Sequence, residues 1–337
     1  MKLYLYRTLR RAVVMLTASG SCVFAADAVI KAPINQTGEY SERYFHSNPT
    51  TVEYVSIKSD GVRIDSVKNG TGAVNLSFGS IDAGENRVAI STYIGDIALG
   101  DVNAGYINVS TNKGNITITG SVQASSEGSA ISISGGDAAG GSFILDNASL
   151  SNVGLSNQWF DESYNIIYDG TVSISGNTTL TDVYFAAGSV EVAAGASLVL
   201  DNVLFTTIEN SNNGRPADTG LVLGDNVTLS LNAGETLNIK ELIVGSGVDI
   251  ILTLSNAEFL TLDNREFNIF SVENGEIDFS DVNFTFTDGE QYKRGTISAT
   301  GGTISVTGSQ IITVPEPTTA TLSLLALCGL AARRRRK

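Results

Sequence analysis

The chain consists largely of short runs in which hydrophobic and polar residues alternate. Between residues 52 and 313 these runs are separated by Gly, Asn, Asp and Ser, which are typical turn residues. Each run places Val, Ile or Leu on one face and Ser, Thr or Asn on the other, which predicts half-buried β-strands rather than helices. Clear examples are residues 74–78, 107–110, 115–119, 130–134, 171–175, 227–231 and 303–307.

Similar runs recur along the chain at a spacing near 20. Residues 95–97 (Gly-Asp-Ile) match 114–116 (Gly-Asn-Ile) at an offset of 19, and residues 182–185 match 202–205 at an offset of 20. The offset from Val88 to Ile107 is also 19, whereas that from Ile107 to Ile131 is 24, so turns take insertions. Such a period suits a parallel β-helix, whose turns stack about 4.8 Å apart with Asn, Gly and Asp at the corners.

We therefore expect an all-β body, residues 51–313, folded as a right-handed parallel β-helix (solenoid) that resembles an autotransporter passenger domain. A β-sandwich is the alternative, because short strands at such close spacing fit it too. Aromatic residues make up only 7 % of the chain, which favours the β-helix. Residues 26–50 are expected to cap the first turn. An irregular loop near 157–169, rich in aromatic residues, is expected to cover the side of the body.

Residues 1–25 have the organisation of a secretory signal peptide. Four basic residues and no acidic residue are followed by an apolar stretch at 12–18 and by small residues. We predict a signal helix over residues 1–25 and cleavage by signal peptidase between Ala25 and Ala26. An N-terminal anchor is the alternative, but the apolar stretch is short for a bilayer of about 30 Å. Arg10-Arg11 and Cys22 match twin-arginine and lipoprotein signals only weakly.

The C-terminus combines a proline motif, an apolar segment and a basic end. Val314-Pro315-Glu316-Pro317 precedes the mostly apolar residues 320–332, and the chain ends in Arg333, Arg334, Arg335, Arg336 and Lys337. The two prolines hold the motif extended, which suits a protease. The basic cluster can reach the lipid headgroups and fix the end of a short membrane helix at the cytoplasmic face.

This arrangement, over residues 314–337, resembles the PEP-CTERM sorting signal of Gram-negative bacteria. The resemblance implies that Pro315, Glu316 and Pro317 are recognised by the membrane enzyme exosortase. It also implies transient anchoring in the inner membrane through residues 320–332 and the basic cluster, followed by passage to the cell surface or the extracellular matrix. A plain C-terminal anchor without processing is the alternative. The signal gives no information on the role of the body.

The charge balance excludes several classes of protein. The chain has 21 Lys and Arg against 35 Asp and Glu, a net charge of −14, and residues 26–317 alone carry −23 and no Cys. An acidic chain of this kind is not expected to bind nucleic acid. Two Cys and one His exclude a disulfide scaffold and a His-based metal centre. We expect no cofactor; weak surface binding of calcium stays open, with no site assigned.

Residues with catalytic potential are few. Asp161 and Glu162 are one candidate pair, and Glu276, Asp278 and Asp281 are a second candidate set for a polysaccharide lyase or glycosidase. A solvated acidic face explains both sets better, because basic residues are scarce. His46 lies in the atypical N-terminal stretch. We assign no catalytic, cofactor or metal site.

The sequence thus predicts an exported, non-catalytic structural or adhesive protein of the cell surface or extracellular matrix. Extracellular polysaccharide is a candidate partner. A carbohydrate-active β-helix enzyme and an adhesin for a specific glycan are the alternatives.

Overall fold

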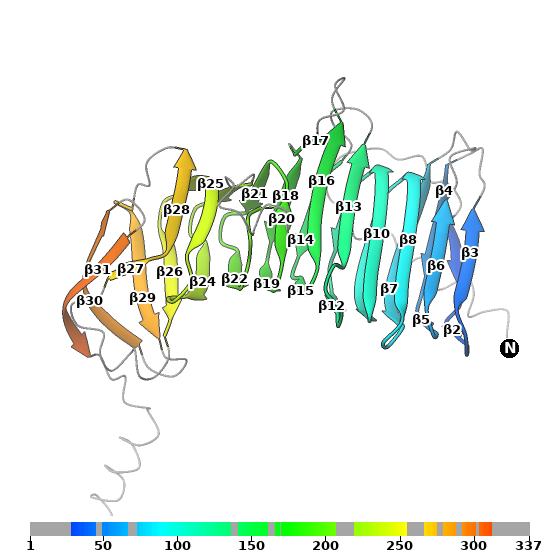
Figure 1. Cartoon of the computed structure of the whole chain (residues 1–337), viewed down its shortest axis with the longest axis horizontal. Helices are drawn as coiled ribbons and strands as arrows, with labels where there is room; N and C mark the ends of the chain where they lie inside the picture. The colour runs from blue at the N-terminus through cyan, green and yellow to red at the C-terminus, as the bar shows by residue number, and fades with distance from the viewer. Residues whose placement is uncertain are drawn as a thin grey trace, which may run out of the picture.

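The computed structural model describes the chain in segments: residues 28–44, 49–66, 73–135, 141–160, 166–168, 170–206, 219–254, 266–274, 279–287, 292–300 and 303–311. Regular structure within these segments is entirely β-strand, and most neighbouring strands are parallel. The strands follow one another along an elongated molecule (Figure 1). The predicted all-β body is confirmed for these residues, whereas the expected signal and membrane helices lie outside them.

The parallel strands form three stacks around a common interior, and the chain visits the stacks in turn. Stack 1 contains β1 (Ala28–Lys31), β4 (Thr50–Tyr54), β7 (Val74–Asp82), β9 (Ile97–Ala104), β11 (Ile116–Ile118), β14 (Phe143–Asp146), β18 (Thr171–Ser175), β21 (Ser189–Val192), β23 (Gly220–Leu223) and the end of β25 (Leu237–Val244).

Stack 2 follows stack 1 in each described turn of the chain as far as residue 253. It contains β2 (Ile34–Asn35), β5 (Ile57–Lys58), the ends of β7 and β9, β12 (Ser121–Ala124), β15 (Ser149–Ser151), β19 (Asn177–Thr181), β22 (Ser197–Asp201), β24 (Thr228–Asn232), β26 (Val248–Thr253) and β29 (Val282–Thr287).

Stack 3 completes each turn. It contains β3 (Tyr40–Tyr44), β6 (Val62–Ser66), β8 (Arg87–Ile94), β10 (Tyr106–Lys113), β13 (Ala130–Gly135), β16 (Gly154–Phe160) and β20 (Tyr184–Ala186); further along the chain, the start of β25 pairs with β28 (Phe270–Asn274). The arrangement is consistent with a parallel β-helix. It differs from a β-sandwich, whose sheets are antiparallel.

The interior is filled by ladders of mainly aliphatic residues that stack from turn to turn. In stack 1, one position of each strand pairs with the same position of the next strand and is buried. This ladder contains Val52, Leu76, Ile97, Ile116, Phe143, Val172, Val190, Leu221 and Leu242. Burial of such side chains contributes about 1.5–3 kcal/mol each, so the ladders are a main source of stability.

The strand register confirms most of the spacing found in the sequence. Ile97 pairs with Ile116 and Val88 with Ile107, both at the expected offset of 19. Tyr184 bridges Leu204 at the offset of 20. Ile131, however, pairs with Val109 rather than with Ile107. Ile107 and Ile131 are identical residues, but they do not occupy equivalent positions. The register pairs residues that face the interior at the same point of each strand.

Two regions depart from parallel pairing. At the C-terminal end, β30 (Tyr292–Thr300) and β31 (Thr303–Ile311) form an antiparallel pair, and β31 also pairs antiparallel with β27 (Glu266–Asn268). The body predicted for 51–313 thus ends in antiparallel strands (Figure 1). The loop predicted near 157–169 begins as part of β16, which then pairs antiparallel with β17 (Ile166–Ile167).

The N-terminal segment forms the first turn of the stacks. β1, β2 and β3 pair in parallel with β4, β5 and β6 of the second turn. The predicted cap at residues 26–50 therefore contains strands that continue the repeat, and its Phe45 and His46 lie outside the described residues.

Candidate functional site

Polar side chains at one corner tie each turn to the next. Asn75 Oδ1 accepts a hydrogen bond from the backbone N–H of Asp96 at 2.9 Å, and Asp96 Oδ1 accepts one from the N–H of Asn115 at 2.7 Å. Asn115 Oδ1 continues the series by accepting from the N–H of Ser142 at 2.9 Å. These side chains satisfy backbone donors at the corners, where the strand ladder is interrupted. Asn75 and Asn115 therefore serve as acceptors that join one turn to the next.

Other corner residues adopt the left-handed backbone conformation. Among the described residues, those other than glycine with positive φ are all Asn or Asp, at Asn147, Asn152, Asp182, Asn202 and Asn226. Asn and Asp tolerate this region better than other side chains. The repeat of 182–185 at 202–205 therefore reflects two equivalent corners, with φ of 53° at both Asp182 and Asn202.

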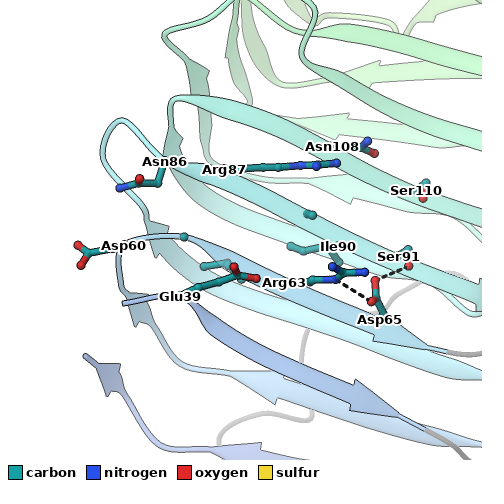
Figure 2. A pocket seen from close by; sticks show the side chains of 13 residues that line it. Glu39, Asp60, Arg63, Asp65, Asn86, Arg87, Ile90, Ser91, Asn108 and Ser110 are labelled. Atoms are coloured by element: carbon teal, nitrogen blue, oxygen red, sulfur yellow. Dashed lines mark hydrogen bonds and ion pairs between the residues drawn. The ribbon is translucent and has the colours of Figure 1, made fainter. Parts of the chain in front are cut away.

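A groove of about 550 Å³ crosses the outer face of stack 3 near its N-terminal end. Its walls and floor come from the turns before β3 and β6 and from the outward residues of β6, β8 and β10 (Figure 2). The charged and polar lining residues are Glu39, Asp60, Arg63, Asp65, Asn86, Arg87, Ser91, Asn108 and Ser110. This groove brings together more polar functional groups than the corner turns do, and it is the candidate site.

An ion pair lies along the groove wall. Arg63 Nε donates to Asp65 Oδ2 at 3.2 Å, and Ser91 Oγ donates to Asp65 Oδ1 at 3.1 Å. The Arg63 side chain remains 60 % exposed and that of Asp65 24 %. Both carboxylate oxygens are therefore held in place, while much of the Arg63 side chain faces solvent.

The floor of the groove is low at Ala89. In the strand register, Ala89 lies between Arg63 on β6 and Asn108 on β10, so a methyl group separates two longer side chains. Beside it, the guanidinium of Arg87 lies over the ring of Tyr106, 5.5 Å from the ring centroid. Figure 2 shows Arg87 directed along the sheet towards Asn108, whereas Asp60 points away at the turn.

Asp60 has a structural role at that turn. Its Oδ2 accepts the backbone N–H of Gly38 at 2.8 Å. A second hollow, of about 610 Å³, is also lined by this turn and by Lys58, which pairs with Asp82 at 3.1 Å. Hydrogen bonds from Lys58 and Asn103 lower the pKa of the Asp82 carboxyl. The carboxylates of Asp60 and Asp82 therefore form contacts that join neighbouring turns.

The first two turns also share a hydrogen-bonded cluster, the Glu42 network, formed by Lys31, Tyr40, Glu42, Tyr44 and Tyr54. Glu42 Oε1 accepts from Lys31 Nζ at 2.7 Å. Glu42 Oε2 accepts from the hydroxyls of Tyr40 at 2.5 Å and Tyr54 at 2.9 Å. The hydroxyls of Tyr44 and Tyr54 are 2.5 Å apart. The network lies at the N-terminal end of the interior rather than on the groove.

The network shifts the titration of its members. Burial by itself raises the pKa of Glu42, but the hydrogen bonds from Lys31 and the three tyrosines outweigh it and lower the pKa to about 2. Burial and the carboxylate of Glu42 raise the pKa of Tyr40 above the usual range. Burial raises the pKa of Tyr54 too, and the neighbouring hydroxyl of Tyr44 and the carboxylate of Glu42 add to the effect. At neutral pH the network therefore holds a carboxylate and neutral phenols, which suits a structural role.

Most of the sequence-predicted site residues lie outside the described segments. They are Ala25, Ala26, His46, Asp161, Glu162, Glu276, Asp278, Val314, Pro315, Glu316, Pro317, Arg333, Arg334, Arg335, Arg336 and Lys337. Asp281 is described and is exposed directly before β29. Sequence reasoning missed the groove, because its residues are far apart in the chain and only the register brings them together.

Within the described segments, no three His, Cys, Asp or Glu side chains converge as metal ligands. No helix among those residues has the length and apolar character needed to cross a membrane.

Comparison with known proteins identifies one segment of the chain. Residues 313–337 match the PEP-CTERM protein-sorting motif. The motif indicates an exported protein that is processed by exosortase and reaches the cell surface or the outside of the cell. No curated protein and no solved structure matches the chain.

Proposed function

We propose that this protein is a non-catalytic structural or adhesive component of the cell surface or extracellular matrix. Its body is a right-handed parallel β-helix similar to an autotransporter passenger domain, and exosortase releases it from transient inner-membrane anchoring. The sorting motif at residues 313–337 carries the proposal, because it directs the body to the outside.

The use of the carboxylates supports a non-catalytic body. Asp60, Asp96, Asp101 and Asp225 each accept a backbone N–H at a turn, at 2.7–2.9 Å. A catalytic acid or base must instead be free to exchange a proton with the substrate. The acidic side chains at these corners act as fixed acceptors that join successive turns.

Replacement of Pro315-Glu316-Pro317 by three alanines tests the sorting step. We expect the variant to stay in the membrane fraction at full length, because the extended motif that a protease would recognise is gone. Immunoblots of membrane and released fractions measure this. The matched control replaces Thr318 and Thr319 by alanine, which should leave release unchanged. Normal processing and release of the triple-alanine variant would refute the sorting mechanism.

A carbohydrate-active enzyme is the second candidate, since the groove combines carboxylates with Arg63 and Arg87. Incubation of the purified protein with acidic and neutral polysaccharides, followed by assay of new reducing ends, separates the two proposals. Release that disappears in Asp65→Asn would establish the enzyme. The structural proposal expects no release.

A further inference from the structure

The groove on stack 3 runs across successive turns rather than along one strand. Its lining residues on β6, β8 and β10 are neighbours in the register, in the rows Arg63, Ala89, Asn108 and Asp65, Ser91, Ser110. Neighbouring strands lie about 4.8 Å apart. A linear molecule placed in the groove therefore meets a new strand, with new outward side chains, at each such step.

The groove offers donors and acceptors side by side. The guanidinium of Arg63 donates, while the Asp65 carboxylate accepts, and the ion pair between them fixes both groups. The side chains of Ser91, Asn108 and Ser110 can do either. A sugar hydroxyl is also both donor and acceptor, so adjacent hydroxyls of one sugar unit match such a row.

The charges of the groove disfavour an acidic ligand. In its lining Glu39 and Asp65 balance Arg63 and Arg87, and Asp60 adds a further carboxylate at the turn on its edge. The whole chain has a net charge of −14, so a polyanion would approach against a repulsive field. A neutral chain meets no such cost, and its hydroxyls can pair with the polar side chains that face the groove.

We propose that this groove binds a neutral, hydroxyl-rich linear polysaccharide, with its chain lying across β6, β8 and β10 and one sugar unit above Ala89. The inference deepens the proposed surface function by naming the ligand class and the site. It depends on the proposed function only in that the protein must reach the outside of the cell to meet this ligand.

The low floor at Ala89 gives a direct test. Phenylalanine at this position projects outward, so it fills the groove without entering the core, and aromatic residues are well tolerated in strands. Ala98→Phe is the matched control, because Ala98 also faces outward, on β9 of stack 1, between Ser77 and Thr117. Both variants use the full chain, and circular dichroism checks their folding.

Binding is measured by calorimetry against neutral hexasaccharides of β-linked glucose, mannose and xylose, with polygalacturonate as the acidic probe. We expect at least one neutral hexasaccharide to bind. Ala89→Phe should weaken that binding by about tenfold or more, because the ring occupies the space of one sugar unit. Ala98→Phe should leave it unchanged.

If Ala89→Phe fails to fold, a substitution that removes a charge from the groove provides a second test of binding. Arg63→Gln removes exposed donors from the groove wall and should also weaken binding about tenfold, the usual worth of a hydrogen bond from a charged group. Lys240→Gln removes an exposed cation from β25 and should have no effect.

Three results would each overturn the inference: no neutral probe binds, both Phe variants bind like the unmodified chain, or polygalacturonate binds more tightly than every neutral probe. None of them alters the triple-alanine sorting experiment, so failure here is distinguishable from failure of the proposed function.

Discussion

Glu42 should make the first turn of the stacks sensitive to acid. Its side chain is 24 % exposed and accepts hydrogen bonds from Lys31, Tyr40 and Tyr54. A pKa of about 2, against the ordinary 4.5, corresponds to at most about 3 kcal/mol of stability. Because the folded pKa is the lower one, this stabilisation is fully present above pH 4.5 and is lost as the pH falls towards 2.

The substitution Glu42→Gln keeps the shape of the side chain and removes its charge. In a repeat structure each turn contacts only its neighbours, so the loss should be local. Hydrogen-exchange mass spectrometry of peptides covering β3 and β6 measures it. At pH 7 we expect protection of β3 to fall by up to about a hundredfold, the equivalent of about 3 kcal/mol.

The pH dependence distinguishes the electrostatic explanation from a packing defect. The difference between Glu42→Gln and the unmodified chain should shrink as the pH falls from 4.5 towards 2. The control is Glu53→Gln on β4, because the Glu53 side chain makes no hydrogen bond within the described segments; it should show no difference at either pH. Unchanged protection in Glu42→Gln at pH 7, or a loss equally large at every pH, would contradict an electrostatic role for Glu42.

Two further changes test the interior and the corners. Ile116→Ala opens a cavity in the stack 1 ladder and should lower the free energy of unfolding by about 2–5 kcal/mol in urea titrations, whereas Thr117→Ala on the outer face should cost far less. Gly114→Ala places a Cβ 2.1 Å from the carbonyl oxygen of Gly95 at a φ of +152°, so we expect a lower melting temperature and poor refolding. Gly234→Ala, where a Cβ has open space, should melt like the unmodified chain; equal melting of both glycine variants would contradict this account of the corner.

The repeat could be predicted from the sequence wherever neighbouring residues alone determine a strand or a turn. Alternation of Val, Ile and Leu with Ser and Thr set the strands, and Asn or Asp at tight corners marked the turns. The pairs Ile97–Ile116 and Val88–Ile107 followed from identical spacing in turns without insertions.

Other features depended on contacts between turns of unequal length. Arg63, Ala89 and Asn108 share one row of the groove although the first step along the chain is longer than the second. No local pattern aligns them, because insertions in the intervening corners change the spacing. The antiparallel pairing of β30 and β31 was likewise hidden, since their alternation is the same as that of the parallel strands.

The Lys31–Glu42 pair also affects self-association of the protein. The first turn leaves one edge of β1, β2 and β3 without a parallel strand beyond it in the described structure, and such an edge is a template for adding further chains. A second molecule stacked there would have to cover a partly buried ammonium and carboxylate with its own interior ladder, at a large desolvation cost. We therefore expect the charge pair in the first turn to disfavour end-to-end stacking of two molecules at this edge.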